Sequence, residues 1–278
     1  TIIQDDSRSG DIQQGNFSLS GPLLADTLGL QVYGRASSRQ EDRFVDGFEE
    51  KNLKNLNARL SFTPTDNQDF TLEAGQTKQD RRSLIGYSAP ATGCRGGCTD
   101  SDNEYTREVL ALSHTGRWDF GTTDSYVQRE EAENLTREMK VTNTSAKTAL
   151  VTPLGDHLLT VGANFEKEEL SDETSNQISN RTEVDASKWA LFAEDEWMLP
   201  GNVSVTGGLR LDDDENYGSH VSPRLYGVWG MAPRWTLKGG VSTGFRSPSL
   251  REITPDWGQT SRGGDVYGNP DLEPETSV

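Results

Sequence analysis

Apolar and polar residues alternate with a period of two along most of this chain, which is the pattern of β-strands with two unlike faces. The segment WTLKGGVSTGFR shows it most clearly. One face of this segment carries Trp235, Leu237, Gly239, Val241, Thr243 and Phe245, and the other carries Thr236, Lys238, Gly240, Ser242, Gly244 and Arg246. The segments NVSVTGGLRLD, LGLQVYGRA and LLTVGANFE repeat the design. Helical periodicity is nearly absent, so the pattern predicts an all-β protein.

About twelve strands are predicted, and the connections between them alternate in length. The strands are expected near residues 13–20, 27–38, 53–62, 69–79, 105–115, 122–132, 135–150, 157–169, 186–198, 203–213, 221–231 and 235–246. Short turns fall at 21–26, 64–68, 116–121, 153–156, 200–202 and 232–234. Most opposite connections are long and polar, at 39–52, 80–104, 170–185 and 247–274, while two, near 133 and 214–220, are shorter. This arrangement predicts an antiparallel up-and-down meander with two unlike ends.

Two kinds of barrel fit such a meander, and they differ in which face points inward. A soluble barrel such as a lipocalin turns its apolar face inward, whereas a transmembrane barrel turns it toward lipid. Trp235 and Phe245 are separated by a span of about 33 Å at the usual strand rise. Tilted by about 40°, that span projects to about 25 Å, the height of a lipid-facing band. The number of strands and the slim Gly, Ala and Thr positions on the apolar face also favour the transmembrane barrel.

The polar faces of the strands carry basic residues that a transmembrane barrel would direct into its lumen. These residues are Arg35, Arg210, Arg224, Lys238 and Arg246. Each on its own is equally well explained as a solvated charge of the wall. Together they indicate a polar lumen, filled by water or by another protein element.

Composition excludes some classes of protein. The net charge is -17, with 27 basic and 44 acidic residues, which argues against a nucleic-acid-binding surface. Only 32% of the residues are hydrophobic, yet Trp, Phe and Tyr recur at regular places, which argues against disorder. No apolar stretch approaches the roughly 18 residues of a membrane helix. No signal-peptide pattern opens the chain, so we do not expect Thr1 to be a natural start.

The two cysteines, Cys94 and Cys98, lie in the segment ATGCRGGCTD. A zinc site usually needs four converging ligands, and the chain offers this pair and three scattered histidines. We therefore expect no metal site and no cofactor. A short-loop disulfide in an oxidising compartment is the preferred interpretation, and two free thiols are the alternative.

Several segments resemble a known family. GGLRLDDDENYGSHVSPRLYGVW (207–229), LKGGVSTGFRSPSLREITPDW (237–257) and GNPDLEPETS (268–277) are similar to TonB-dependent outer-membrane siderophore receptors, most of all to the colicin I receptor and ferric-enterobactin receptor group. FSLSGPL, SHTGRWDFGT, LLTVGANFE and ALFAEDEW agree, so the resemblance runs along nearly the whole chain. It implies a location in the bacterial outer membrane.

The resemblance also implies an architecture larger than this chain. Members of the family have a barrel of about 22 strands around an N-terminal plug. The whole of residues 1–278 is therefore expected to be the first half of such a barrel, without the plug and without a TonB box. Its implied function is import of ferric catecholate siderophores, powered by the TonB–ExbB–ExbD complex through the plug, and such receptors are also exploited by colicins. Other cargo, such as haem, another siderophore or cobalamin, remains an alternative.

Two long loops carry the residues expected to hold the ligand. A ferric catecholate combines negative charge with aromatic rings, so arginine and aromatic side chains suit it. The candidates are Arg81, Arg82, Tyr87 and Arg95 in the loop 80–104, and Trp257, Arg262 and Tyr267 in the loop 247–274. The alternative for each is an ordinary loop residue without a ligand.

Acidic runs work against an anionic ligand. EELSDET (168–174), LDDDENYG (211–218) and QREEAEN (128–134) would repel it at long range, although salt screens this repulsion beyond about 8–10 Å. The runs fit solvated carboxylates, or carboxylates that bind divalent cations bridging to lipopolysaccharide phosphates. DDDEN is too irregular for a calcium loop.

No catalytic constellation is found, because no GxSxG elbow or phosphate-binding GK[ST] ending occurs. An outer-membrane enzyme is therefore disfavoured. A passive porin remains an alternative, but it would need a closed barrel of about 16–18 strands.

Overall fold

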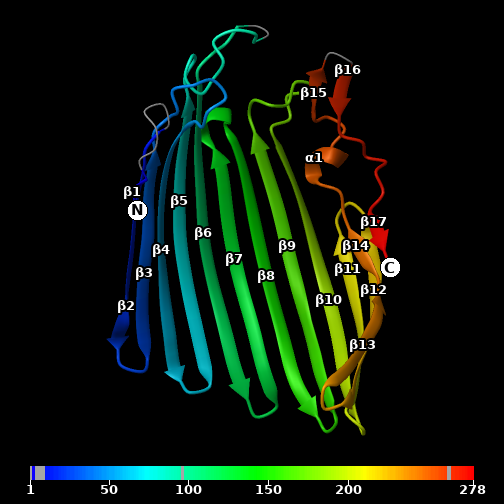
Figure 1. The fold of residues 1–278 in the computed structure, drawn as a ribbon. Helices are drawn as coiled ribbons and strands as arrows, with labels where there is room; N and C mark the ends of the chain where they lie inside the picture. Colours follow the sequence, from blue (N-terminus) through cyan, green and yellow to red (C-terminus); the bar gives the residue numbers. More distant parts are fainter. Residues whose placement is uncertain (1, 4–9, 95–96, 262–263) are drawn as a thin grey trace.

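The computed structural model describes residues 2–3, 10–94, 97–261 and 264–278, and most of them form one large antiparallel sheet (Figure 1). Consecutive strands are hydrogen-bonded neighbours throughout. The strands of the sheet are β1 (Ile2–Ile3), β2 (Ile12–Leu24), β3 (Leu28–Arg39), β4 (Glu50–Thr65), β5 (Gln68–Ser83), β6 (Ser101–Trp118), β7 (Gly121–Asn134), β8 (Met139–Leu154), β9 (His157–Asp172), β10 (Glu183–Leu199), β11 (Val203–Asp214), β12 (Gly218–Ala232) and β13 (Trp235–Ser242). The predicted all-β meander is therefore confirmed.

Smaller elements occupy the end of the sheet opposite the short turns (Figure 1). A 3-10 helix, η1 (Leu135–Arg137), joins β7 to β8. After β13 the chain forms β14 (Gly244–Arg246), the short helix α1 (Leu250–Ile253), the hairpin β15 (Gly258–Ser261) and β16 (Gly264–Tyr267), and finally β17 (Glu275–Ser277). β14 pairs with β17, so the chain leaves the large sheet and starts a new pairing. Among the described residues, no helix has the length and apolar composition needed to cross a membrane.

Several strands extend further at the loop end than the alternation predicted. β5 continues to Ser83 and β6 begins at Ser101, which shortens the predicted loop 80–104 to residues 84–100. The added residues are polar on both faces, so no hydrophobic period marks them. Backbone pairing carries them instead, since Arg82 lies opposite Glu50 on one side and Asp102 on the other. At the loop end, the strands of the sheet therefore continue beyond their apolar segments.

The last predicted strand, 235–246, is interrupted at Thr243. Its amide donates to the carbonyl of Pro223, after which β14 turns away to β17. The ring of Phe245 then stacks on His220, with centroids 4.5 Å apart. His220 belongs to the polar face of β12, so the expectation that Phe245 shares the apolar face of Trp235 was wrong. Strict alternation fails wherever a strand changes partners.

The two faces of the sheet differ in exposure as well as in polarity. Leu225 and Val241 lie opposite each other on β12 and β13, and both are exposed on the apolar face. Leu209 on β11 belongs to the same face and is 59% exposed. On the opposite face, Ala190 and Thr206 are buried, at 1% and 8% exposure. Side chains crowd together on the inside of a curved sheet and spread apart on the outside, so the polar face is the concave one.

Candidate ligand-binding site at the loop end

The polar face of the sheet is lined by side chains that pair across neighbouring strands. Arg107 on β6 donates two hydrogen bonds to Glu130 on β7, at 2.7 and 2.8 Å. Most of the basic residues predicted for this face also have partners: Arg35 donates to Gln14, and ion pairs join Arg210 to Asp212, Arg224 to Glu194 and Arg246 to Glu275. Lys238 is exposed on β13. The concave wall is thus polar without a large excess of positive charge.

Two loops are fastened together at the loop end of β3 to β6. The β3–β4 loop, residues 40–49, meets the β5–β6 loop, residues 84–100, through Glu41. Its carboxylate accepts hydrogen bonds from the backbone N–H of Leu84, at 2.6 Å, and from both the N–H and the hydroxyl of Ser88. A carboxylate that accepts three hydrogen bonds holds its surroundings in one geometry.

Asp42, the next residue, organises the β3–β4 loop from within. It is 1% exposed, and its carboxylate accepts hydrogen bonds from the N–H groups of Gly10 and Phe48 and from the guanidinium of Arg39. Burial alone would raise the pKa of Asp42. The two backbone N–H groups and Arg39 outweigh burial and hold that pKa below its ordinary value. Asp42 is therefore an ionised structural anchor.

The predicted ligand residues near this loop pair project in different directions. Arg81 lies on the concave face of β5, where it forms an ion pair with Glu49 at 3.3 Å and lies over the ring of Tyr105 at 6.0 Å. Arg82 follows it in the strand and therefore lies on the opposite face. Tyr87 is 44% exposed in the β5–β6 loop. Arg95 lies outside the described residues, and a disulfide joins Cys94 to Cys98 beside it. Only some of these candidates can therefore face a ligand inside the barrel.

The segment 247–274 folds back onto the concave face. Helix α1 starts with a capping box, in which the Glu252 carboxylate accepts hydrogen bonds from the N–H and the hydroxyl of Ser249. The helix directs Leu250 against a small apolar cluster that also contains Leu170, Val184 and Trp257. Leu170 and Val184 lie opposite each other on β9 and β10. An apolar patch at the top of the polar wall thus docks this segment.

Trp257 is the centre of that docking. It is 2% exposed, and its indole N–H has no hydrogen-bond partner in the described part of the chain. Its predicted contact with a ligand stays a prediction, because in this conformation the ring contacts protein. Tyr267 on β16 is 61% exposed, and its contact with a ligand also stays a prediction. Arg262 lies outside the described residues.

The same segment is joined to the β9–β10 loop, residues 173–182, by a group of contacts that we name the loop clasp. It consists of Asn176, Ser179 and Arg181 with Asp256 and Gly258. The Asn176 amide donates to the carbonyl of Asp256 at 2.9 Å and accepts from the N–H of Gly258 at 3.2 Å. The Ser179 hydroxyl also donates to the carbonyl of Asp256, and Arg181 lies 3.7 Å from its carboxylate. The clasp makes one unit of two loops that are distant in sequence.

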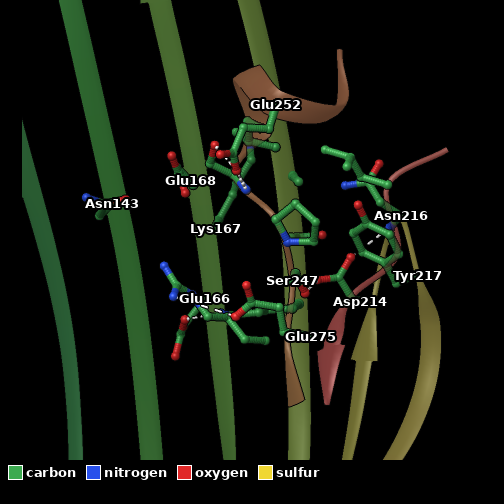
Figure 2. A pocket seen from close by; sticks show the side chains of 18 of the residues that line it. Asn143, Glu166, Lys167, Glu168, Asp214, Asn216, Tyr217, Ser247, Glu252 and Glu275 are labelled. Atoms are coloured by element: carbon green, nitrogen blue, oxygen red, sulfur yellow. Dashed lines mark hydrogen bonds and ion pairs between the residues drawn. The ribbon is translucent and has the colours of Figure 1, made fainter. Parts of the chain in front are cut away.

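A cavity of about 800 Å³ lies between this segment and the wall formed by β8 to β11 (Figure 2). Its lining includes Glu166 and Glu168 from β9, Asp214 from β11, Tyr217 from the β11–β12 turn and Glu252 from α1. Glu168 belongs to the acidic run 168–174 of the sequence, and Asp214 and Tyr217 belong to the acidic run 211–218. Their convergence depends on how residues 247–274 fold over the sheet, which the alternation of apolar and polar residues does not predict.

The comparisons with known proteins agree with this architecture. The family model of the TonB dependent receptor-like β-barrel matches residues 3–278. The chain belongs to this family of TonB-dependent receptors. The family consists of outer-membrane receptors rather than enzymes, so the receptor lies in the bacterial outer membrane.

The names of two similar proteins refer to iron. It is 51% identical to the "Iron-regulated outer membrane virulence protein" of Vibrio cholerae, over 100% of this chain and 43% of that protein. It is 29% identical to "Ferric enterobactin receptor PirA" of Pseudomonas aeruginosa, over 100% of this chain and 46% of that protein. The crystal structure of the siderophore receptor PirA from the same species matches with a TM-score of 0.78 and 28% identity, over 99% of this chain and 49% of that chain. The chain thus spans less than half the length of these relatives.

Proposed function

We propose that the receptor imports ferric siderophores of the catecholate type. The observation that carries this proposal is the similarity along the whole chain to a protein named as a ferric enterobactin receptor. The relative from Vibrio cholerae, which is named as iron-regulated, supports a role in iron acquisition. In this proposal residues 1–278 form the first half of the barrel.

The loop end of β5 offers chemistry that suits such a cargo. Arg81 lies on the concave face beside the ring of Tyr105, and Tyr87 is exposed in the β5–β6 loop. A guanidinium next to aromatic rings attracts both the negative charge and the catechol rings of a ferric catecholate. Arg82 and Arg95 belong to the same region, and Tyr267 with Arg262 and Trp257 form the second set of candidates. We favour Arg81, because the cavity beneath residues 247–274 is rich in carboxylates.

Partners of the complete protein follow from the same proposal. A plug domain lies inside the barrel and is pulled by the TonB–ExbB–ExbD complex, which supplies energy that a passive pore lacks. The apolar outer face contacts membrane lipid, and the charged residues above it contact lipopolysaccharide. Colicins that bind the loop end use the same receptor for entry.

The test compares two neighbouring arginines in the full-length receptor. Arg81→Ala removes a charged donor from the concave face, whereas Arg82→Ala removes the same charge from the opposite face. A charge-assisted hydrogen bond contributes about 1.5–3 kcal/mol, so Arg81→Ala is expected to weaken ferric enterobactin binding by about tenfold to a hundredfold. Binding of radioactive ferric enterobactin to intact cells, at equal receptor abundance, measures the effect.

Arg82→Ala is the matched control and is expected to bind as the unmodified receptor does. Equal loss in both variants would assign the effect to general loop electrostatics and remove Arg81 from the site. If the unmodified receptor binds no ferric catecholate, the cargo proposal fails while membership of the family stands.

A further inference from the structure

A groove of about 510 Å³ crosses strands β4 to β7 on the convex face of the sheet. Two small side chains, Ala58 and Ala74, lie opposite each other on β4 and β5 and form its floor. Leu56 and Leu110 lie beside them and are 54% and 55% exposed. The groove is therefore a place where two methyl groups interrupt a layer of larger apolar side chains.

The groove stays open when the barrel is complete. Strands β4 to β7 each have hydrogen-bonded neighbours on both sides, so further strands are added only at the two edges of the sheet. The convex face carries the apolar side chains that meet lipid. An occupant of the groove therefore comes from the membrane, and the lumen of the barrel plays no part.

Two lysines lie on the same face just beyond the groove. Lys54 and Lys78 are exposed and directly opposite each other on β4 and β5, at the next position of this face after Leu56 toward the loop end. Like charges directly opposite on neighbouring strands destabilise a sheet. Their outer cross-strand neighbours, Ala36 and Thr106, are uncharged, and neither ammonium forms an ion pair with any residue that the structure describes. The sheet thus places two positive charges side by side without pairing either of them with a carboxylate.

The carboxylates at the rim of the groove are already engaged. Glu131 forms ion pairs with Arg129 at 2.6 Å and with Lys140 at 2.7 Å. Glu108 accepts a hydrogen bond from the amide of Gln76 at 2.6 Å. Neither carboxylate therefore neutralises the two lysines.

The order of groups along the strands gives an occupant a direction. Short turns lie at the periplasmic end of outer-membrane barrels, so the alanines lie deeper in the membrane and the lysines lie nearer the cell exterior. Lys54 is four residues from Ala58, about 13 Å at the usual strand rise. Asp80 and Glu104 lie one position beyond Lys78, so a group that extends out of the membrane meets the lysines first. A lipid with an apolar chain on the alanines and an anionic head group at the lysines therefore belongs to the outer leaflet.

We propose that this groove and the two lysines bind lipopolysaccharide, the phosphorylated glycolipid of the outer leaflet. One of its acyl chains lies on Ala58 and Ala74, and one of its phosphate groups lies between Lys54 and Lys78. A phosphate there replaces the repulsion of two ammonium groups by two charge-assisted hydrogen bonds. The proposal rests on the contact with lipopolysaccharide stated for the complete receptor, for which it names the residues, and it does not depend on the cargo.

The test uses purified lipid A, the phosphorylated and acylated part of lipopolysaccharide, as the probe. Native mass spectrometry of the full-length receptor in detergent measures its binding. We expect saturable binding of lipid A and weaker binding of lipid A from which the phosphates have been removed. Lys54→Gln combined with Lys78→Gln is expected to weaken lipid A binding by about three- to thirtyfold, because exposed charge pairs contribute modestly. The same variant is expected to bind dephosphorylated lipid A as the unmodified receptor does.

Ala74→Leu tests the groove separately from the lysines. The larger side chain fills the floor and keeps an apolar residue toward lipid, so assembly of the barrel is expected to be unchanged. Binding of lipid A with and without its phosphates is expected to fall by the same factor, at least about fourfold, which corresponds to the loss of one buried CH₂ group. Unchanged binding in this variant would overturn the placement of the acyl chain.

Lys51→Gln is the matched control, because Lys51 lies on the same strand as Lys54 but on the opposite face. It is expected to leave lipid A binding unchanged. Equal weakening by Lys51→Gln would overturn the proposal, and so would an unchanged affinity of the double lysine variant. Equal affinity for phosphatidylglycerol would show general attraction of anionic lipids and would also overturn it. Ferric enterobactin binding is measured on the same variants and is expected to stay as in the unmodified receptor, so failure here leaves siderophore import untouched.

Discussion

Single buried carboxylates fix the loop end of this receptor where an apolar core would fix another protein. Asp172 is fully buried and accepts hydrogen bonds from the N–H groups of Thr174 and Ser175, which closes the turn after β9. Asp42 does the same for the β3–β4 loop and also binds the N–H of Gly10. Each replaces several apolar contacts by a few charge-assisted hydrogen bonds. Substitution of such a residue is therefore expected to destabilise the loop that it holds.

Asp42→Asn is expected to loosen the β3–β4 loop while leaving the sheet intact. The change removes the charge that accepts from Gly10, Phe48 and Arg39, and a hydrogen bond to a charged group contributes about 1.5–3 kcal/mol. Hydrogen exchange of the amides in residues 40–49 is therefore expected to speed up by at least tenfold. Unchanged exchange of the Phe48 amide would show that the carboxylate does not hold the loop.

The same anchor has a defined pH dependence. The pKa of Asp42 is lower in the folded loop than its ordinary value of 3.8. Its stabilisation is therefore complete above that value and is lost as the pH falls through the lower folded pKa. In the unmodified receptor, loop protection is expected to fall only below about pH 3.8, whereas Asp42→Asn lacks this transition.

At the scale of elements, the loop clasp joins two loops that are far apart in the sequence. A short loop and a long segment, separated by about 80 residues, exchange backbone and side-chain hydrogen bonds through Asn176. The clasp holds the hairpin β15–β16 over the top of β9 and β10 (Figure 1). Without it, residues 247–274 would be held to the wall by the apolar cluster, by the hydrogen bond from Ser247 to Asp214 and by the contacts of Arg251 with Asp172 and Ser175.

Asn176→Ala is expected to separate the β9–β10 loop from the segment 247–274 without unfolding β9 or β10. It removes the amide that bridges Asp256 and Gly258, so the amide of Gln177, which donates to the Gly258 carbonyl, loses its protection. We expect its hydrogen exchange to speed up by about fivefold to tenfold. Asn180→Ala, in the same loop but outside the clasp, is the control. Equal exchange in the two variants would mean that contacts other than the Asn176 amide hold the segment.

The sequence predicted the elements of this receptor well, and it failed where long-range docking decides. The alternation of apolar and polar residues identified β11 and most of β13, because one face of each strand contacts an apolar environment and the other contacts a polar one. It could not reveal that β14 leaves the sheet at Thr243, since that depends on pairing with β17. The burial of Trp257 was equally hidden, because Trp257 is separated in sequence from Leu170 and Val184. Successive side chains of a strand point to opposite faces, so the sequence already indicated that Arg81 and Arg82 lie on opposite faces of β5.

At the scale of the whole molecule, the apolar convex face and the polar concave face define how the receptor sits in the membrane. Leu209 projects from the convex face and is 59% exposed, as expected for a side chain that meets lipid. Gly208, its neighbour, lies on the concave face, where an added Cβ would make an ordinary contact with the Glu194 side chain at 3.4 Å. The two positions differ in face but share one strand and one depth.

Leu209→Arg is therefore expected to impair assembly of the full-length receptor far more than Gly208→Arg. An arginine on the lipid face costs about 2–4 kcal/mol near the middle of the membrane, whereas one on the concave face remains in a polar environment beside Glu194. The fraction of receptor that migrates as folded barrel in unheated gel samples measures assembly, at equal expression. Equal assembly of the two variants would show that the face of the sheet does not decide assembly, and greater impairment by Gly208→Arg would show that the faces are assigned the wrong way round. It would also remove the basis for placing Arg81 and the acidic cavity inside the barrel, because both assignments depend on the same alternation.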